Sequence, residues 1–255
     1  MIRATISLPL LTEKLLLILL ALSFLITGVD VAIAHFQNHF IPRYEWIPII
    51  VSPLLFLVTL LYALSKNKVI TLLYKAAMLL GLLIGVVGTL FHVFGNVNAH
   101  ASSALDWLMI GIPVLAPIAY AGMSLFGLAL IEGLSENLLR LIGLGFLVSA
   151  LTAYLDHAST HFESPFTIIP IISGMFAFMV CWIYATKNDD TDFFYVVMSV
   201  MILVGLLGAY VHVITNLRGT VQFSWWVMFY RTPPLAPLVL SQLGVLGILS
   251  ALRKE

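Results

Sequence analysis

The strongest constraint on this chain is a series of apolar runs, each close to the length of about 20 residues that a helix needs to cross a bilayer. Hydrophobic residues make up 61% of the sequence and charged residues 9%, far below the roughly 25% charged content of soluble domains. Backbone polar groups must be paired inside a bilayer, so the runs predict helices. The eight predicted spans are residues 15–36, 46–64, 70–94, 107–131, 138–157, 166–186, 192–215 and 234–252.

The first run also has features of a secretory signal, because leucines follow Lys14 and Ala32-Ile33-Ala34 resembles a cleavage site. However, the run matches an internal segment, residues 138–162, that no signal peptidase removes. We therefore expect a retained span. The predicted class is an all-α integral membrane protein with eight transmembrane helices, and its short connections leave no room for a second soluble domain.

A group of polar residues, glycines and prolines occurs twice along the chain and indicates an internal repeat. Each copy holds four predicted spans, an even number, so both copies have the same orientation in the membrane. The predicted fold is a tandem duplication of two parallel-oriented four-helix units, residues 1–136 and 137–255, within one membrane domain. The matches are Asp30, His35 and Phe36 with Asp156, His161 and Phe162, and Gly85, Gly88, His92, Val93, Asn96, Pro113, Pro117 and Gly127 with Gly205, Gly208, His212, Val213, Asn216, Pro233, Pro237 and Gly247.

Basic residues predict the orientation of the eight spans. Nine of the 12 Lys and Arg residues lie on the side of the two termini, and three lie on the other. Cytoplasmic loops carry the excess of positive charge, which places both termini in the cytoplasm of an inner or plasma membrane. All seven histidines then lie at or near the outer face.

In each predicted unit the first and third spans bring one histidine each toward the outer face. His35 then accompanies His92, and His161 accompanies His212. Two imidazoles on different helices are the arrangement that binds a heme axially or begins a metal site. The nature of the cofactor stays open between heme and a transition metal such as iron, copper or zinc.

Glycines accompany the second histidine of each pair. Gly85 and Gly88 lie seven and four residues before His92, so helical spacing places them on the same face. Such a strip without side chains lets either a flat macrocycle or a neighbouring helix approach closely.

Further polar residues surround these pairs. His39 and His157 lie four residues from His35 and His161, so each two can share a helical face and chelate a metal. His100 and Asp106 have no counterparts in the second copy and are treated as peripheral. Residues expected to orient the ligands or relay protons are Asp30, Asp156, Glu45, Glu163, Asn96 and Asn216.

In layout alone the pattern is similar to the heme A synthases, whose eight spans also form two four-helix halves with a histidine pair in each. Here the histidines fall on the first and third spans of each half. The glutamate–histidine motif and the extended outer loop of that family are absent, so the resemblance assigns no residue roles.

These features predict a membrane protein that binds heme or a transition metal for electron transfer, or for oxidation of a membrane-soluble substrate such as a quinone. If it is an enzyme, it is an oxidoreductase. Two alternatives stay open: a non-catalytic subunit of a larger membrane complex, and a proton or metal-ion transporter. Expected partners are the lipid bilayer and other membrane subunits, whereas a net charge of zero without a basic run excludes nucleic acid.

Overall fold

In a computed structural model of the chain, the regular secondary structure of the described residues is entirely helical. The described residues are 8–36, 39–96, 103–110, 113–187, 190–218, 224, 227 and 232–254. The all-α prediction is therefore confirmed for this part of the chain. The helices are α1 (Leu8–Phe36), η1 (Arg43–Glu45), α2 (Trp46–Leu64), α3 (Lys68–Asn96), α4 (Ala104–Ile110), α5 (Ile118–Ile131), α6 (Ser135–Ser159), η2 (Pro165–Thr167), α7 (Ile168–Lys187), α8 (Thr191–Leu217) and α10 (Leu238–Lys254); η marks a 3₁₀ helix.

Six of the described helices are long and apolar enough to cross a membrane: α1, α2, α3, α6, α7 and α8. They lie where six of the predicted spans were expected. The two other predicted spans correspond to shorter apolar helices, α5 with 14 residues and α10 with 17.

Prolines account for the shortened helices. The predicted span at residues 107–131 is divided in the structure, because α4 ends at Ile110 and α5 begins directly after Pro117. In the same way α10 begins directly after Pro237. Proline lacks a backbone N–H and its ring clashes with the preceding turn, so it suits the start of a helix and not its interior.

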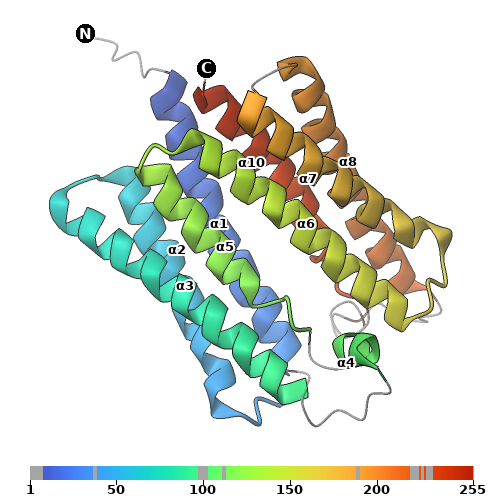
Figure 1. Cartoon of the computed structure of the whole chain (residues 1–255). Coiled ribbons are helices and arrows are strands. Elements are labelled where there is room, and N and C mark those ends of the chain that lie inside the picture. Colours follow the sequence, from blue (N-terminus) through green and yellow to red (C-terminus); the bar gives the residue numbers. More distant parts are fainter. Residues whose placement is uncertain are drawn as a thin grey trace.

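Figure 1 shows both termini at one end of the helical bundle and α4, with the α1–α2 and α6–α7 turns, toward the other end. Helices α1, α5, α6 and α10 contact one another in the centre. Helices α2 and α3 pack on α1 and α5, while α7 and α8 pack on α6 and α10. The two halves therefore use the same order of contacts.

The buried side chains of α1 recur in α6 at a spacing of 122 residues. Stacked aromatic pairs link the next helices in both halves, with ring centres 4.4 Å apart for Tyr62 and Tyr74 and 4.2 Å apart for Tyr184 and Phe194. The recurring core residues, each at most 1% exposed, are Leu16, Leu17, Leu20 and Phe24 in α1 and Leu138, Leu139, Ile142 and Phe146 in α6.

The turns after α1 and α6 have the same spacing of 122 residues. Both contain a His-Phe pair with positive φ, 62° and 51° at His39 and Phe40 and 53° and 50° at His161 and Phe162. The structure therefore relates His35 to His157, one helical turn away from the register of 126 residues inferred from the sequence. The physical reason is that each segment holds two histidines four residues apart, so a sequence match can be displaced by one turn.

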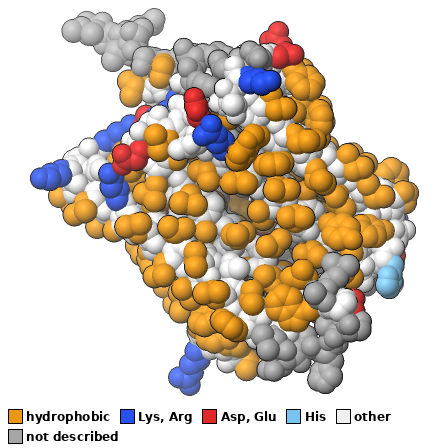
Figure 2. Space-filling view, in the orientation of Figure 1, with side chains coloured by type: hydrophobic (Ala, Val, Ile, Leu, Met, Phe, Trp, Pro, Cys, Tyr) orange, Lys and Arg blue, Asp and Glu red, His pale blue; other side chains and the backbone are white. Residues whose placement is uncertain are grey.

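Charged and apolar side chains are segregated along the bundle. In Figure 2 most of the acidic and basic side chains on the visible face gather toward the end that carries the termini, and a broad hydrophobic band covers the rest. Ion pairs at that end join Lys66 Nζ to Glu13 Oε1 at 2.5 Å and Lys75 Nζ to Glu132 Oε1 at 2.9 Å. A banded surface of this kind suits a bilayer environment.

Candidate metal centres

The first candidate centre lies between the C-terminal ends of α1 and α3. The ring centres of His35 and His92 are 6.4 Å apart, and the rings are tilted by 58°. Nδ1 of His35 donates to the backbone carbonyl of Glu45 at 3.1 Å, and Nδ1 of His92 donates to that of Pro113 at 2.8 Å. A carbonyl can only accept, so each Nδ1 carries a proton, and in the neutral imidazole Nε2 keeps a lone pair that can bind a metal.

The second candidate centre lies between α6 and α8 and has the same ring separation. The ring centres of His157 and His212 are 6.4 Å apart, with an angle of 88° between the rings. Nδ1 of His212 donates to the backbone carbonyl of Pro233 at 2.8 Å, the same bond and length as at His92. His157 therefore takes the place beside His212 that was predicted for His161.

The proline carbonyls are available because the backbone before α5 and α10 is not helical. Pro113 and Pro233 each lie 21 residues after the histidine that they bind. Sequence reasoning missed this role, although the repeated spacing from histidine to proline was a usable signal. The bond makes proline carbonyls part of the support of His92 and His212.

Buried asparagines lie close to these proline segments. Asn216 is 0% exposed, and its Nδ2 donates to the Thr232 carbonyl at 2.7 Å while its Oδ1 accepts from the Thr232 N–H at 2.9 Å. These two hydrogen bonds hold Thr232, the residue before Pro233, against α8. Asn96 is also buried, and its backbone carbonyl accepts from Trp107 Nε1 at 2.7 Å, which ties α4 to the end of α3.

The glycine strips beside His92 and His212 are filled by neighbouring helices. A Cβ atom added at Gly88 would lie 2.9 Å from Pro117 Cβ, and one added at Gly208 would lie 2.8 Å from Pro237 Cβ. Gly85 likewise faces the backbone of Ala121. Of the two expected roles, close helix packing is therefore the one adopted, and α5 and α10 stand where a macrocycle would approach these faces.

Other predicted residues lie apart from the paired rings. His39 and His161 are exposed on their turns, Glu163 and Asp156 are exposed, and Asp30 is half-buried in α1. Within the described part of the chain, no three His, Cys, Asp or Glu side chains are arranged to hold a metal ion. His100 lies outside the described residues, and Asp106 lies on α4.

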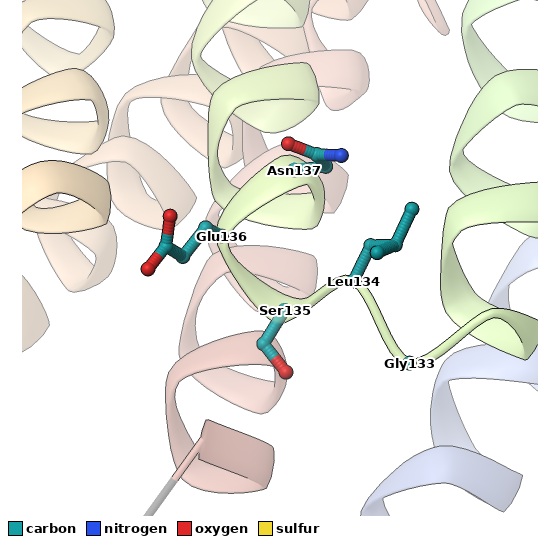
Figure 3. Close-up of a pocket in the computed structure, with 5 residues that line it drawn as sticks. All are labelled: Gly133, Leu134, Ser135, Glu136 and Asn137. Carbon is teal, nitrogen blue, oxygen red and sulfur yellow. The ribbon is translucent and has the colours of Figure 1, made fainter.

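A hollow at the opposite end of the bundle offers no comparable chemistry. Figure 3 shows its lining residues, Gly133 to Asn137, along the turn that leads from α5 into α6. Glu136 is the only titratable side chain among the five. The histidine pairs therefore remain the candidate centres.

No protein-family model, curated protein or solved structure matches the chain. Its function is accordingly inferred from the geometry of the two histidine pairs.

Proposed function

We propose that the chain is a membrane protein in which two imidazole pairs, His35 with His92 and His157 with His212, bind heme iron or a transition-metal ion and serve redox chemistry. The observation that carries the proposal is the repeated orientation of His92 and His212. In both, Nδ1–H donates to a proline carbonyl at 2.8 Å, and Nε2 is left as the nitrogen that can bind a metal. Metal-binding histidines characteristically donate their other N–H to such an acceptor.

The two rings of each pair are close enough for one ion to contact both. A metal–nitrogen bond is about 2.0–2.1 Å, so two rings that bind one ion must lie close to each other. Both pairs have a separation of 6.4 Å. Two imidazoles would also be the protein ligands of a bis-histidine heme, and the chemistry proposed is electron transfer or oxidation of a membrane-soluble substrate such as a quinone.

A purely structural role for the same imidazoles has one specific observation in its favour. The segments before α5 and α10 are not helical, and backbone carbonyls at membrane depth need a donor. His92 and His212 supply that donor to Pro113 and Pro233. The structural role uses only the Nδ1–H group, whereas metal binding also uses the lone pair of Nε2. The two roles are therefore distinguished by whether the protein carries metal.

The proposed topology is eight spans in two parallel four-helix units, with both termini in the cytoplasm. At 1.5 Å per residue the 14 residues of α5 cover about 21 Å, so the segment before it has to complete the crossing of a hydrocarbon core of about 30 Å. Irregular backbone at such depth is tolerated where protein buries it. Two observations support the duplication: buried residues recur at a spacing of 122 residues, and both termini lie at one end of the bundle (Figure 1).

The test is metal analysis combined with a reduced-minus-oxidised optical spectrum of protein purified in mild detergent. We expect bound metal, with Soret and alpha bands if it is heme iron. His92→Ala and His212→Ala should each remove one centre. His39→Asn and His161→Asn are the matched controls and should keep both, because these rings lie on exposed turns and Asn tolerates positive φ.

Absence of metal and of bands, both after purification and after addition of ferrous iron, cupric ion, zinc or hemin, would leave the structural role of the imidazoles. Equal metal content in the wild type and in both alanine variants would also refute the proposal.

A further inference from the structure

Three hydroxyl groups in the interior of the first half have no hydrogen-bond partner among the described residues. They belong to Thr59 on α2, Tyr74 on α3 and Ser124 on α5. Each of these residues is 0% exposed. Buried polar groups are nearly always hydrogen-bonded, either to the protein or to ordered water, and a hydroxyl can both donate and accept. The three hydroxyls therefore mark a polar site inside the helical bundle.

The contacts of two glycines place these hydroxyls within a short section of the bundle. The Ser124 hydroxyl lies against Gly81 of α3, and a Cβ atom added at Gly127 would lie 2.6 Å from the Tyr74 hydroxyl. Along α3, Gly81 lies about two turns after Tyr74. Thr59 lies about one turn of α2 from the tyrosine ring that stacks on Tyr74, with ring centres 4.4 Å apart. The three hydroxyls thus lie at neighbouring levels where α2, α3 and α5 pack together.

Polar groups continue from this site toward the histidine end of the bundle. About one turn before Ser124 on α5, the Tyr120 hydroxyl forms a hydrogen bond of 2.6 Å with Oγ of Ser52. Both residues are buried, and Tyr120 is within electrostatic range of Asp30 on α1. A carboxylate therefore stands at this end of the series, in the part of α1 that leads to the first histidine pair.

In the other direction the series approaches the charged residues near the termini. Tyr74 is within electrostatic range of Glu13 on α1. The Glu13 carboxylate forms ion pairs with Lys66 Nζ at 2.5 Å and with a guanidinium nitrogen of Arg253 at 3.6 Å. The Lys66 side chain is 44% exposed, so this group of charges reaches the surface. The buried hydroxyls therefore lie between two carboxylates of α1, one toward each end of the bundle.

The second half lacks this series, although its helices pack in the same order. Corresponding positions of α1 and α6, and of α2 and α7, are 122 residues apart. For α3 with α8 and α5 with α10 the spacing is 120, because Gly127 faces the sulfur of Met78 as Gly247 faces that of Met198. The shared packing therefore does not require the hydroxyls. The counterparts of Thr59, Tyr74, Ser124, Ser52 and Tyr120 are Cys181, Phe194, Gly244, Gly174 and Leu240, and those of Glu13 and Asp30 are Ser135 and Thr152.

We propose that the first half conducts protons between its two ends along water molecules bound by the hydroxyls of Thr59, Tyr74 and Ser124. Each hydroxyl or water accepts a proton on one side and releases its own on the other, so no group is consumed and one positive charge crosses per proton. Asp30 and Glu13 take up and release the proton at the two ends. Ionisable residues inside membrane proteins characteristically mark such relays. The relay goes beyond the proposed metal centres and needs no metal.

The test is proton flux into liposomes that contain purified protein and trapped pyranine, a dye whose fluorescence reports internal pH. A potassium gradient with valinomycin sets an inside-negative potential that draws protons inward. The triple variant Thr59→Val, Tyr74→Phe, Ser124→Ala removes the three hydroxyls with little change in side-chain shape. Ser250→Ala is the matched control, because Ser250 lies in the second half, is also 0% exposed and likewise has a hydroxyl without a partner among the described residues.

We expect liposomes with the wild-type protein to acidify faster than protein-free liposomes. The triple variant should lose this flux and fall to the protein-free rate, whereas Ser250→Ala should keep the wild-type rate. Tyr74→Phe alone should also lower the flux. This single change is the mildest of the set, because the second half already packs Phe194 on a tyrosine ring at the corresponding position.

A wild-type rate equal to that of protein-free liposomes would overturn the inference, and so would equal rates for the wild type and the triple variant. If the triple variant does not elute as a monodisperse folded protein, Tyr74→Phe decides, and a wild-type rate in that variant would overturn the inference. A decrease in Ser250→Ala equal to that in Tyr74→Phe would do the same. None of these results bears on the proposed function, because the flux is measured without added metal and the metal content of the same preparations is determined separately.

Discussion

Asn216→Ala tests whether a buried amide supports the segment that His212 contacts. The substitution removes two hydrogen bonds, from Asn216 Nδ2 to the Thr232 carbonyl at 2.7 Å and from the Thr232 N–H to Asn216 Oδ1 at 2.9 Å. Asn216 is 0% exposed, so water does not replace these bonds without movement of the segment. Side-chain hydrogen bonds in membrane proteins contribute about 0.6 kcal/mol on average and up to about 1.7 kcal/mol, which gives about 1–3 kcal/mol for the two.

The expected consequence reaches beyond stability. Thr232 precedes Pro233, whose carbonyl accepts from His212 Nδ1 at 2.8 Å. Release of Thr232 should loosen that carbonyl and weaken metal binding at the second pair while the first pair is unaffected. One assay is the midpoint of denaturant unfolding in detergent, followed by tryptophan fluorescence. The other is Co²⁺ titration of protein that also carries His35→Ala and His92→Ala and therefore keeps only the second pair.

Thr215→Ala is the matched control, because Thr215 is the neighbouring residue on α8 and its side chain is exposed. It should leave both the unfolding midpoint and Co²⁺ binding close to those of the wild type. If Asn216→Ala matched this control in both assays, the account of Asn216 as the support of the Pro233 segment would be refuted.

Three further predictions concern packing, accessibility and metal removal. Gly88→Ala should destabilise the protein by about 1–3 kcal/mol, because its Cβ would lie 2.9 Å from Pro117 Cβ and force α3 and α5 apart. Gly122→Ala should instead be neutral or stabilising by up to about 1 kcal/mol, because a Cβ there meets no atom within 4 Å and alanine favours the helix; equal unfolding midpoints for the two variants would contradict this account. Cys181 is buried and is the single cysteine, so a maleimide should label it only after unfolding, and rapid labelling of the native protein would show that α7 packs differently. On the proposed function, chelation should lower the thermal midpoint of the wild type but not that of a variant lacking His92 and His212, and an equal decrease in both would contradict metal binding at these pairs.

The positions of the long helices could be predicted from the sequence because the length and hydropathy of each apolar run are local properties of that run. The helix α2 begins and ends at the predicted residues, Trp46 and Leu64, and α3 extends the predicted 70–94 by only two residues at each end. The same reasoning failed at residues 107–131, where hydropathy remains high across Pro113 and Pro117. Whether a proline kinks a membrane helix or ends it depends on the partner that pairs with the released carbonyl, and that partner, His92, lies on another helix.

The histidines show the same division between local and tertiary information. Local sequence determined that imidazoles gather near one end of the bundle, and it identified His35 with His92 as a pair. It could not decide between His157 and His161, because residues four apart lie on the same face of a helix and a sequence pattern does not distinguish them. The structure places α6 so that His157 faces His212, while the turn after Ser159 takes His161 away.

Sequence alone therefore determined the all-helical class, the apolar spans and the recurrence of polar residues in two halves, because these depend on residues close together in the chain. Only the tertiary structure decided which histidines meet, that glycine strips receive α5 and α10, and that Glu45 rather than Glu163 is buried beside a pair. The physical reason is that contacts between helices depend on the register of whole packed faces, in which a shift of one turn exchanges one side chain for another.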